Sequence, residues 1–175
     1  MTTPQFVLDL REKVGHMPLW MPGCTAVVVR CAHPDAHGHR PEVALPCAPE
    51  DVEVLVVRRA DNGQWTPVTG IVDPGEEPAA AAVRETLEEA DVVARATRLV
   101  SVEVVGPVTY DNGDVTTYVD TAFLLQWAQG EPFPADGENT EAHFVRADRL
   151  PAMNERFTRT LARALSGEVG AAFRP

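Results

Sequence analysis

The sequence has few cysteines and no long hydrophobic run. Cys24, Cys31 and Cys47 are its only cysteines, too few for a fold held together by disulfides. No stretch approaches the roughly 20 consecutive apolar residues that a membrane-spanning helix needs. The N-terminal stretch also lacks the basic segment and apolar run of a secretory signal. We therefore expect a cytoplasmic protein with no membrane partner.

Positive charge is scarce as well. The chain carries 15 Lys and Arg against 26 Asp and Glu, a formal net charge of −11, and its sequence pI is about 4.8. Such a chain repels a phosphate backbone, and no local basic patch offsets the repulsion, so duplex nucleic acid is an improbable partner. A small anionic substrate remains possible if a metal cation supplies the missing positive charge.

The length and composition are those of one globular domain. The chain has 175 residues, 45% hydrophobic and 23% charged, with no low-complexity tract. Folding at this length buries roughly 70% of the surface that the unfolded chain exposes, enough for one sizeable core. We expect a single domain over residues 1–175.

Hydrophobic patterning predicts three helices and several strands. We expect a short helix over residues 3–14 with Thr3 as its cap and Pro4 in its first turn, a central helix from Pro78 to Ala90, and a final helix over 154–165. Strands are expected at 25–29, 52–57, 65–68, 98–105, 115–127 and 143–146. This order predicts an α+β fold with a mixed sheet flanked by helices.

The central helix carries an unusual cluster of carboxylates. At about 100° per residue, Glu85, Glu88 and Glu89 project from one side with Arg84. The other side is formed by Ala79, Ala82, Val83, Thr86, Leu87 and Ala90. Like charges at this spacing destabilise a helix by a few tenths of a kcal/mol per pair. Arg84 can offset part of the repulsion and a hard divalent cation the rest. The alternative is a solvated acidic face on a surface helix.

The full spacing resembles the Nudix box of the Nudix hydrolases. The segment reads Gly70-x5-Glu76-x7-Arg84-Glu85-x2-Glu88-Glu89-x-Asp91-Val92 and matches every charged position of that pattern. It departs at Thr86, where an aliphatic residue is usual, and at Asp91, where glycine is usual. The resemblance implies the Nudix fold over a core of about residues 24–150, a mixed β-sheet sandwiched between α-helices. It also implies a Mg²⁺-dependent enzyme, with Mn²⁺ as a substitute, that hydrolyses a nucleoside diphosphate linked to another moiety.

The resemblance also implies roles for single residues. Glu85 and Glu89 would be the main metal ligands, joined by Glu88 and by the carbonyl of Gly70. Arg84 would orient these carboxylates, and Glu76 would brace the loop before the helix. The box does not fix the general base. Glu141 is our first candidate from a later loop and Glu138 the second, and for each the alternative is an ordinary solvated residue.

Weaker features bear on the substrate. Pro107, sixteen positions after Asp91, resembles a marker of ADP-ribose pyrophosphatases, and Tyr110 lies near the position of a tyrosine in diadenosine polyphosphate hydrolases. Both also fit a plain hairpin connection. Trp65 is a candidate to stack on a nucleotide base. We favour an ADP-ribose or nucleotide-sugar substrate.

Other functions stay open. They are a nucleoside triphosphate pyrophosphohydrolase of the housecleaning type, a non-catalytic nucleotide sensor and an isopentenyl diphosphate isomerase, which also uses a Nudix-like fold. The His- and Cys-containing loop of residues 31–47 matches no standard zinc spacing, so no dedicated zinc site is expected there. The N-terminal helix could serve a homodimer.

Overall fold

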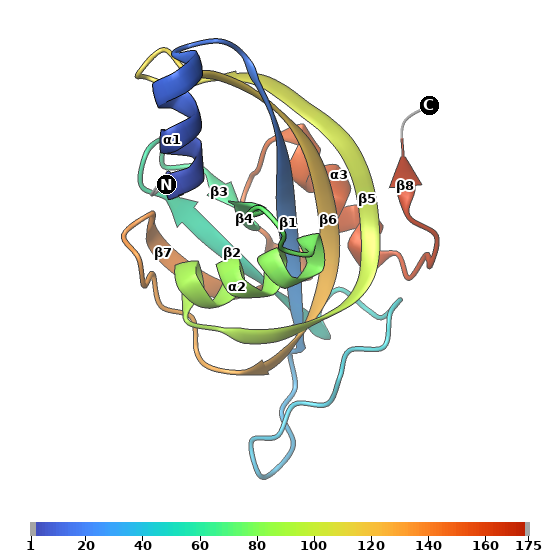
Figure 1. Cartoon of the computed structure of the whole chain (residues 1–175). Helices are drawn as coiled ribbons and strands as arrows, with labels where there is room; N and C mark the ends of the chain where they lie inside the picture. The colour runs from blue at the N-terminus through green and yellow to red at the C-terminus, as the bar shows by residue number, and fades with distance from the viewer. Residues whose placement is uncertain (1–2, 174–175) are drawn as a thin grey trace.

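The computed structural model describes residues 3–173 and centres on one mixed sheet with a helix against each face (Figure 1). The strand order is β3-β2-β1-β6-β5-β8, with β4 paired to β1 and β7 paired to β2. The elements are α1 (Gln5–Val14), β1 (Leu19–Cys31), β2 (Val52–Arg59), β3 (Trp65–Thr66), β4 (Val68–Ile71), α2 (Pro78–Ala90), β5 (Val93–Thr109), β6 (Val115–Gln129), β7 (Asn139–Arg146), a 3-10 turn (Ala147–Arg149), α3 (Glu155–Leu165) and β8 (Ala172–Phe173). The expected α+β sheet-and-helix architecture is confirmed.

Strand β1 organises the sheet. It runs parallel to β6 along most of its length, and pairs antiparallel with β4 near its middle and with β2 at its end. Its side chains alternate, so that Ala26 and Val28 face α2 while Val27 and Val29 face α3. Because helices cover both faces, β1 is a continuous apolar run instead of an alternating pattern.

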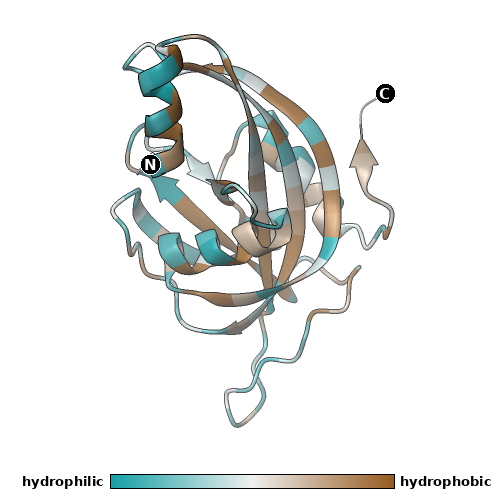
Figure 2. Ribbon diagram, in the orientation of Figure 1, coloured by the Kyte–Doolittle hydropathy of each residue, from teal (hydrophilic) through white to brown (hydrophobic). Residues whose placement is uncertain are grey.

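Helix α2 has the limits that the sequence predicts. Pro78 opens the helix, where its missing N–H is no loss, and Asp91 ends it in the left-handed conformation with φ 53° and ψ 33°. Ala81, Ala82 and Ala90 are fully buried, and their small side chains let the helix lie close to the sheet. Figure 2 shows α2 pale over its alanine-rich part and teal where its charged residues follow.

Several boundaries differ from the prediction. Helix α1 begins at Gln5 after Pro4, with no side-chain cap from Thr3. The single strand expected at 65–68 is two strands, because Pro67 has no N–H to donate and the chain changes partner there, from β2 to β1. Strands β1 and β5 extend beyond the predicted limits, and β8 was not predicted. No helix within residues 3–173 is long and apolar enough to cross a membrane.

Candidate active site

The three carboxylates of α2 lie at different depths. Glu89 is 5% exposed, and the side chains of Glu85 and Glu88 are 14% and 52% exposed. Thr86 is buried on the packing side, where its hydroxyl donates to the carbonyl of Ala82 at 2.7 Å. Glu85, Glu88 and Glu89 therefore form an acidic stripe on α2, which runs from the protein interior at Glu89 to the solvent at Glu88.

Arg84 ties this stripe to the loop before the helix. Its guanidinium donates to both oxygens of Glu76, at 3.0 and 2.9 Å, and to Glu85 and Glu88, both at 2.9 Å. It also donates to the carbonyl of Ile71. The Arg84 hydrogen bonds lower the pKa of Glu76 and keep it ionised. One planar cation thus holds three carboxylates in fixed relative positions.

Gly70 lies directly beside Glu85. A Cβ atom at position 70 would overlap the carboxyl group of Glu85, so glycine is required here for a close approach. Gly70 pairs with Cys24 in the ladder between β4 and β1. The strand backbone and the helix carboxylate therefore meet without an intervening side chain.

Glu85 and Glu89, the two more buried carboxylates, have raised pKa values. Burial raises the pKa of Glu89 to about 8, against the hydrogen bond from Asn139, and raises the pKa of Glu85 to about 7, against the pull of Arg84. The charges of Glu88 and Glu138 raise the pKa of Glu85 further. A buried group of carboxyl oxygens with too little compensating positive charge fits a hard cation. Within residues 3–173, however, no three His, Cys, Asp or Glu side chains are yet arranged to hold one.

The two candidate general bases, Glu138 and Glu141, occupy different positions relative to β7. Ala142 packs on the α2 side of the sheet, so its neighbour Glu141 points to the opposite side, where it pairs with Arg58 at 2.9 Å and His143 at 3.2 Å. Glu138 lies just before β7, and its charge acts on both Glu85 and Glu89. The structure thus brings Glu138, and not Glu141, to the acidic stripe.

Two residues join the cluster that the sequence did not single out. Asn139 donates to the buried carboxylate of Glu89 at 2.8 Å. The hydrogen-bonded ion pair with Asp61, at 2.6 Å, raises the pKa of Arg59, and the charges of Glu89 and Glu138 raise it further. Arg59 faces the α2 side because it lies two residues after Val57, and Asn139 reaches that side because the register of β7 with β2 shifts between Arg58 and Arg59. Neither residue lies at a position that the Nudix-box spacing would identify. They can be found only from the pairing of β2 with β7, which are distant in the sequence.

The weaker substrate candidates lie elsewhere. Trp65 pairs with Arg58 and its ring lies 6.0 Å from that of His143, on the same side as Glu141. Pro107 and Tyr110 belong to the β5–β6 hairpin, whose end lies beside the C-terminal end of α1 (Figure 1). The hydroxyls of Tyr110 and Tyr118 are 2.5 Å apart there. The structure does not join these three residues to the acidic stripe.

Comparisons with known proteins agree with this geometry. A family model described as a NUDIX domain matches residues 38–165. A NUDIX hydrolase from Nitrosomonas europaea is 20% identical with a TM-score of 0.55, and the alignment covers 83% of this chain and 70% of that one. An ADP-ribose pyrophosphatase from Streptococcus suis is 20% identical with a TM-score of 0.55, over 83% and 89% of the two chains. A UDP-X diphosphatase is 16% identical with a TM-score of 0.56, over 91% and 70%. No functionally curated protein matches the sequence.

Proposed function

The chain belongs to the Nudix hydrolase family, a family of pyrophosphohydrolases, and from this premise we propose that it hydrolyses the diphosphate bond of a nucleoside diphosphate linked to another moiety. We favour ADP-ribose or a nucleotide sugar as the substrate. The observation that carries the proposal is the acidic stripe of α2, held by Arg84 and backed by Asn139. Similar structures described as an ADP-ribose pyrophosphatase and a UDP-X diphosphatase support the substrate class.

We propose that Mg²⁺, or Mn²⁺ in its place, would be held by Glu85, Glu89 and Glu88 and by the carbonyl of Gly70. When bound, the cation would neutralise the diphosphate and make a water molecule more acidic. Arg84 positions the carboxylates, since it bonds two of them and anchors to Glu76. The missing side chain at position 70 leaves the carboxylate of Glu85 free to lie against the strand backbone.

The general base is a second part of the proposal. As water attacks phosphorus, its proton passes to a carboxylate and the bond from phosphorus to the bridging oxygen breaks, so the leaving phosphate departs with the electron pair. The electrostatic coupling to Glu85 and Glu89 supports Glu138 for this role. Glu141 stays the second candidate, since its carboxylate is engaged by Arg58.

Arg59 is our candidate for contact with the substrate phosphates. It is a cation beside Glu89 and Glu138, and its bidentate bond to Asp61 holds the guanidinium in place. Positive charge at this point would offset the repulsion between the substrate and the acidic stripe. Arg58 is the matched control, because it is the neighbouring residue and is paired to Glu141 on the other side of the sheet.

The base of the nucleotide needs an aromatic or apolar surface. Trp65 stays our candidate for this contact; it lines a hollow of about 370 Å³ with Gln64 and Met153, on the side of the sheet that carries Glu141. We keep Pro107 and Tyr110 as further substrate-binding candidates at the β5–β6 hairpin.

Three alternative activities set the substrate panel. Triphosphate hydrolysis would use the same acidic stripe. A sensor has no use for a buried ionisable carboxylate such as Glu89, whose raised pKa reflects an unfavourable environment for its charge. An isomerase would need a reactive cysteine near the site. Cys24 is 1% exposed, and burial raises the pKa of its thiol, so the thiol stays protonated and inaccessible.

We also propose that residues 1–175 act as one domain, in the cytoplasm, and that a homodimer is the assembly to test. Strand β1 precedes the family match and β8 follows it, yet both pair within the same sheet, which supports a single domain. The three cysteines are free, which supports a reducing compartment. Sedimentation velocity would separate monomer from dimer.

The decisive experiment is turnover of a substrate panel with and without Mg²⁺, read as the phosphate that a coupling phosphatase or pyrophosphatase releases from the products. The panel holds ADP-ribose, UDP-glucose, NADH, diadenosine polyphosphates, ordinary and oxidised triphosphates, and isopentenyl diphosphate read by product analysis. We expect Mg²⁺-dependent turnover of ADP-ribose or a nucleotide sugar. Glu138→Gln should lower kcat by about 100-fold or more, and Glu141→Gln by much less. Turnover of triphosphates alone, or the reverse order of the two variants, would contradict the assignment.

A further inference from the structure

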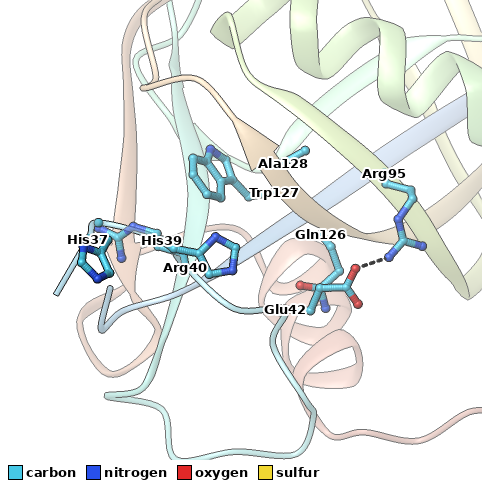
Figure 3. A pocket seen from close by; sticks show the side chains of 9 residues that line it. His37, His39, Arg40, Glu42, Arg95, Gln126, Trp127 and Ala128 are labelled. Carbon is cyan, nitrogen blue, oxygen red and sulfur yellow. Dashed lines mark hydrogen bonds and ion pairs between the residues drawn. The ribbon is translucent and has the colours of Figure 1, made fainter. Parts of the chain in front are cut away.

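A second hollow lies away from the acidic stripe, between the loop of residues 32–51 and the ends of β5 and β6. Its volume is about 470 Å³, within the range of small-molecule sites. Figure 3 shows His37, His39 and Arg40 on one side together with the ring of Trp127, and Arg95 and Glu42 facing each other on the other side. None of the residues of the acidic stripe lines it.

Hydrogen bonds shape the loop although it contains no helix or strand. The backbone N–H groups of His37 and His39 donate to the carboxylate of Asp35, at 2.8 and 2.9 Å. The side-chain amide of Gln126 on β6 bonds both the N–H and the carbonyl of Val43, at 3.0 and 2.9 Å. The two histidines therefore lie on a turn that its own hydrogen bonds hold, and the middle of the loop is hydrogen-bonded to the sheet at Val43.

The hollow concentrates cationic and hydrogen-bond-donating groups in a chain of net charge −11. An imidazole can donate from a ring nitrogen, and a guanidinium has five donor N–H groups. Arg40 uses one nitrogen for the carbonyl of Cys31 and lies 3.7 Å from Glu53, so other donors remain. The ion pair of Arg95 with Glu42 is mostly exposed, and such pairs contribute little, so an incoming anion can replace Glu42.

Trp127 gives the hollow an aromatic wall. Its indole N–H donates to the carbonyl of Gly130 at 2.8 Å, which fixes the ring in one orientation. The ring is half-buried, with part of its surface on the hollow. A flat aromatic group can stack on this surface while an attached anion reaches the nitrogen-bearing side chains.

We propose that this hollow is a second ligand site that binds a nucleoside monophosphate, with the base against Trp127 and the phosphate at His37, His39 and Arg40. The ligand class follows from the pairing of an aromatic wall with donors for an anion, in a space of mononucleotide size. The site holds ligand without catalysing its reaction, because no carboxylate cluster or nucleophile of the kind found on α2 lines it.

The test is an AMP titration in EDTA, followed by the three tryptophan indole N–H signals in NMR spectra and by calorimetry. It uses the wild type and a Glu85→Gln/Glu89→Gln variant, which disables the acidic stripe. We expect AMP to shift the Trp127 indole signal in both proteins. Ribose 5-phosphate and adenosine, each lacking one half of the ligand, should bind at least about tenfold more weakly.

The matched variants lie on the same loop. His37→Ala/His39→Ala should raise the Kd for AMP by about tenfold or more. His33→Ala should leave it unchanged, because His33 pairs with Asp51 outside the hollow. Binding that is equal in all loop variants, or lost only in the Glu85→Gln/Glu89→Gln variant, would overturn the proposal. Either result leaves the hydrolysis proposal standing, and a silent substrate panel would leave AMP binding here intact.

Discussion

Asn139 and Glu89 lie fifty positions apart in the chain, yet the amide of Asn139 donates to the carboxylate of Glu89 at 2.8 Å. This bond joins the first residue of β7 to the last turn of α2. Two backbone bonds run beside it, from Phe133 to the carbonyl of Ala90 and from Ala135 to that of Glu89. The segment before β7 thus closes the buried end of the acidic stripe.

Loss of the Asn139 amide should destabilise the protein. Asn139→Ala leaves the buried carboxyl group of Glu89 without this donor, and we expect the free energy of unfolding to fall by about 1–3 kcal/mol. Urea denaturation in EDTA measures it. Thr140→Ala, at an exposed neighbouring position, is the control and should change stability by less than about 0.5 kcal/mol. Equal losses in the two variants would show that the bond to Glu89 is not the cause.

Divalent metal should stabilise the folded protein through the acidic stripe. At a Mg²⁺ concentration about 100 times its Kd, binding to the native state alone adds about 2.7 kcal/mol. We expect a rise in the melting temperature of the wild type, and none in Glu85→Gln/Glu89→Gln. Glu89→Gln should also reduce turnover steeply while its circular dichroism stays native. A variant that gains as much from Mg²⁺ as the wild type would place the cation elsewhere.

In EDTA, stability should fall as the pH rises from about 4.5 to about 8. The pKa values of Glu85 and Glu89 are raised to about 7 and about 8, so between these limits the folded protein binds protons that the unfolded chain has released. Their contribution is complete below the unfolded value of 4.5 and is lost above the folded values. Denaturation midpoints across this range measure the slope. The Glu85→Gln/Glu89→Gln variant should show a flatter profile, and a wild-type profile that rises would contradict the raised values.

The left-handed residue at the end of α2 should favour glycine. Among residues 3–173, Asp91 alone has a positive φ without being glycine. A side chain in this conformation costs about 1 kcal/mol or more, partly offset by the greater freedom of glycine in the unfolded chain. We therefore expect Asp91→Gly to stabilise by about 0.5–1 kcal/mol, and Asp91→Ala to destabilise. A lower melting temperature for Asp91→Gly would indicate that the Asp91 carboxylate has a positive role.

Local sequence signals were sufficient to predict α2, but not to predict which residues from other parts of the chain contact it. Pro78, the run of alanines and the charged stripe fixed both ends of the helix, because all of these act within a few turns of one another. The place of Asn139 depends on how β7 pairs with β2, and that register is set by contacts between distant parts of the chain. For the same reason, the sequence alone does not show which of Glu141, our first candidate, and Glu138 lies nearer the acidic stripe.

Pro78 and Asp91 fix the two ends of α2, so the length of the helix cannot change without moving its side chains. One residue inserted between Glu85 and Glu89 would turn everything after it by about 100°. Glu89 would then leave the amide of Asn139, while Glu85 stayed beside Gly70. Insertions and deletions accumulated over evolution should therefore be absent from residues 78–91. They should be accepted in the exposed loop of residues 32–51 outside the turn of residues 37–40, because this loop can lengthen without moving the sheet.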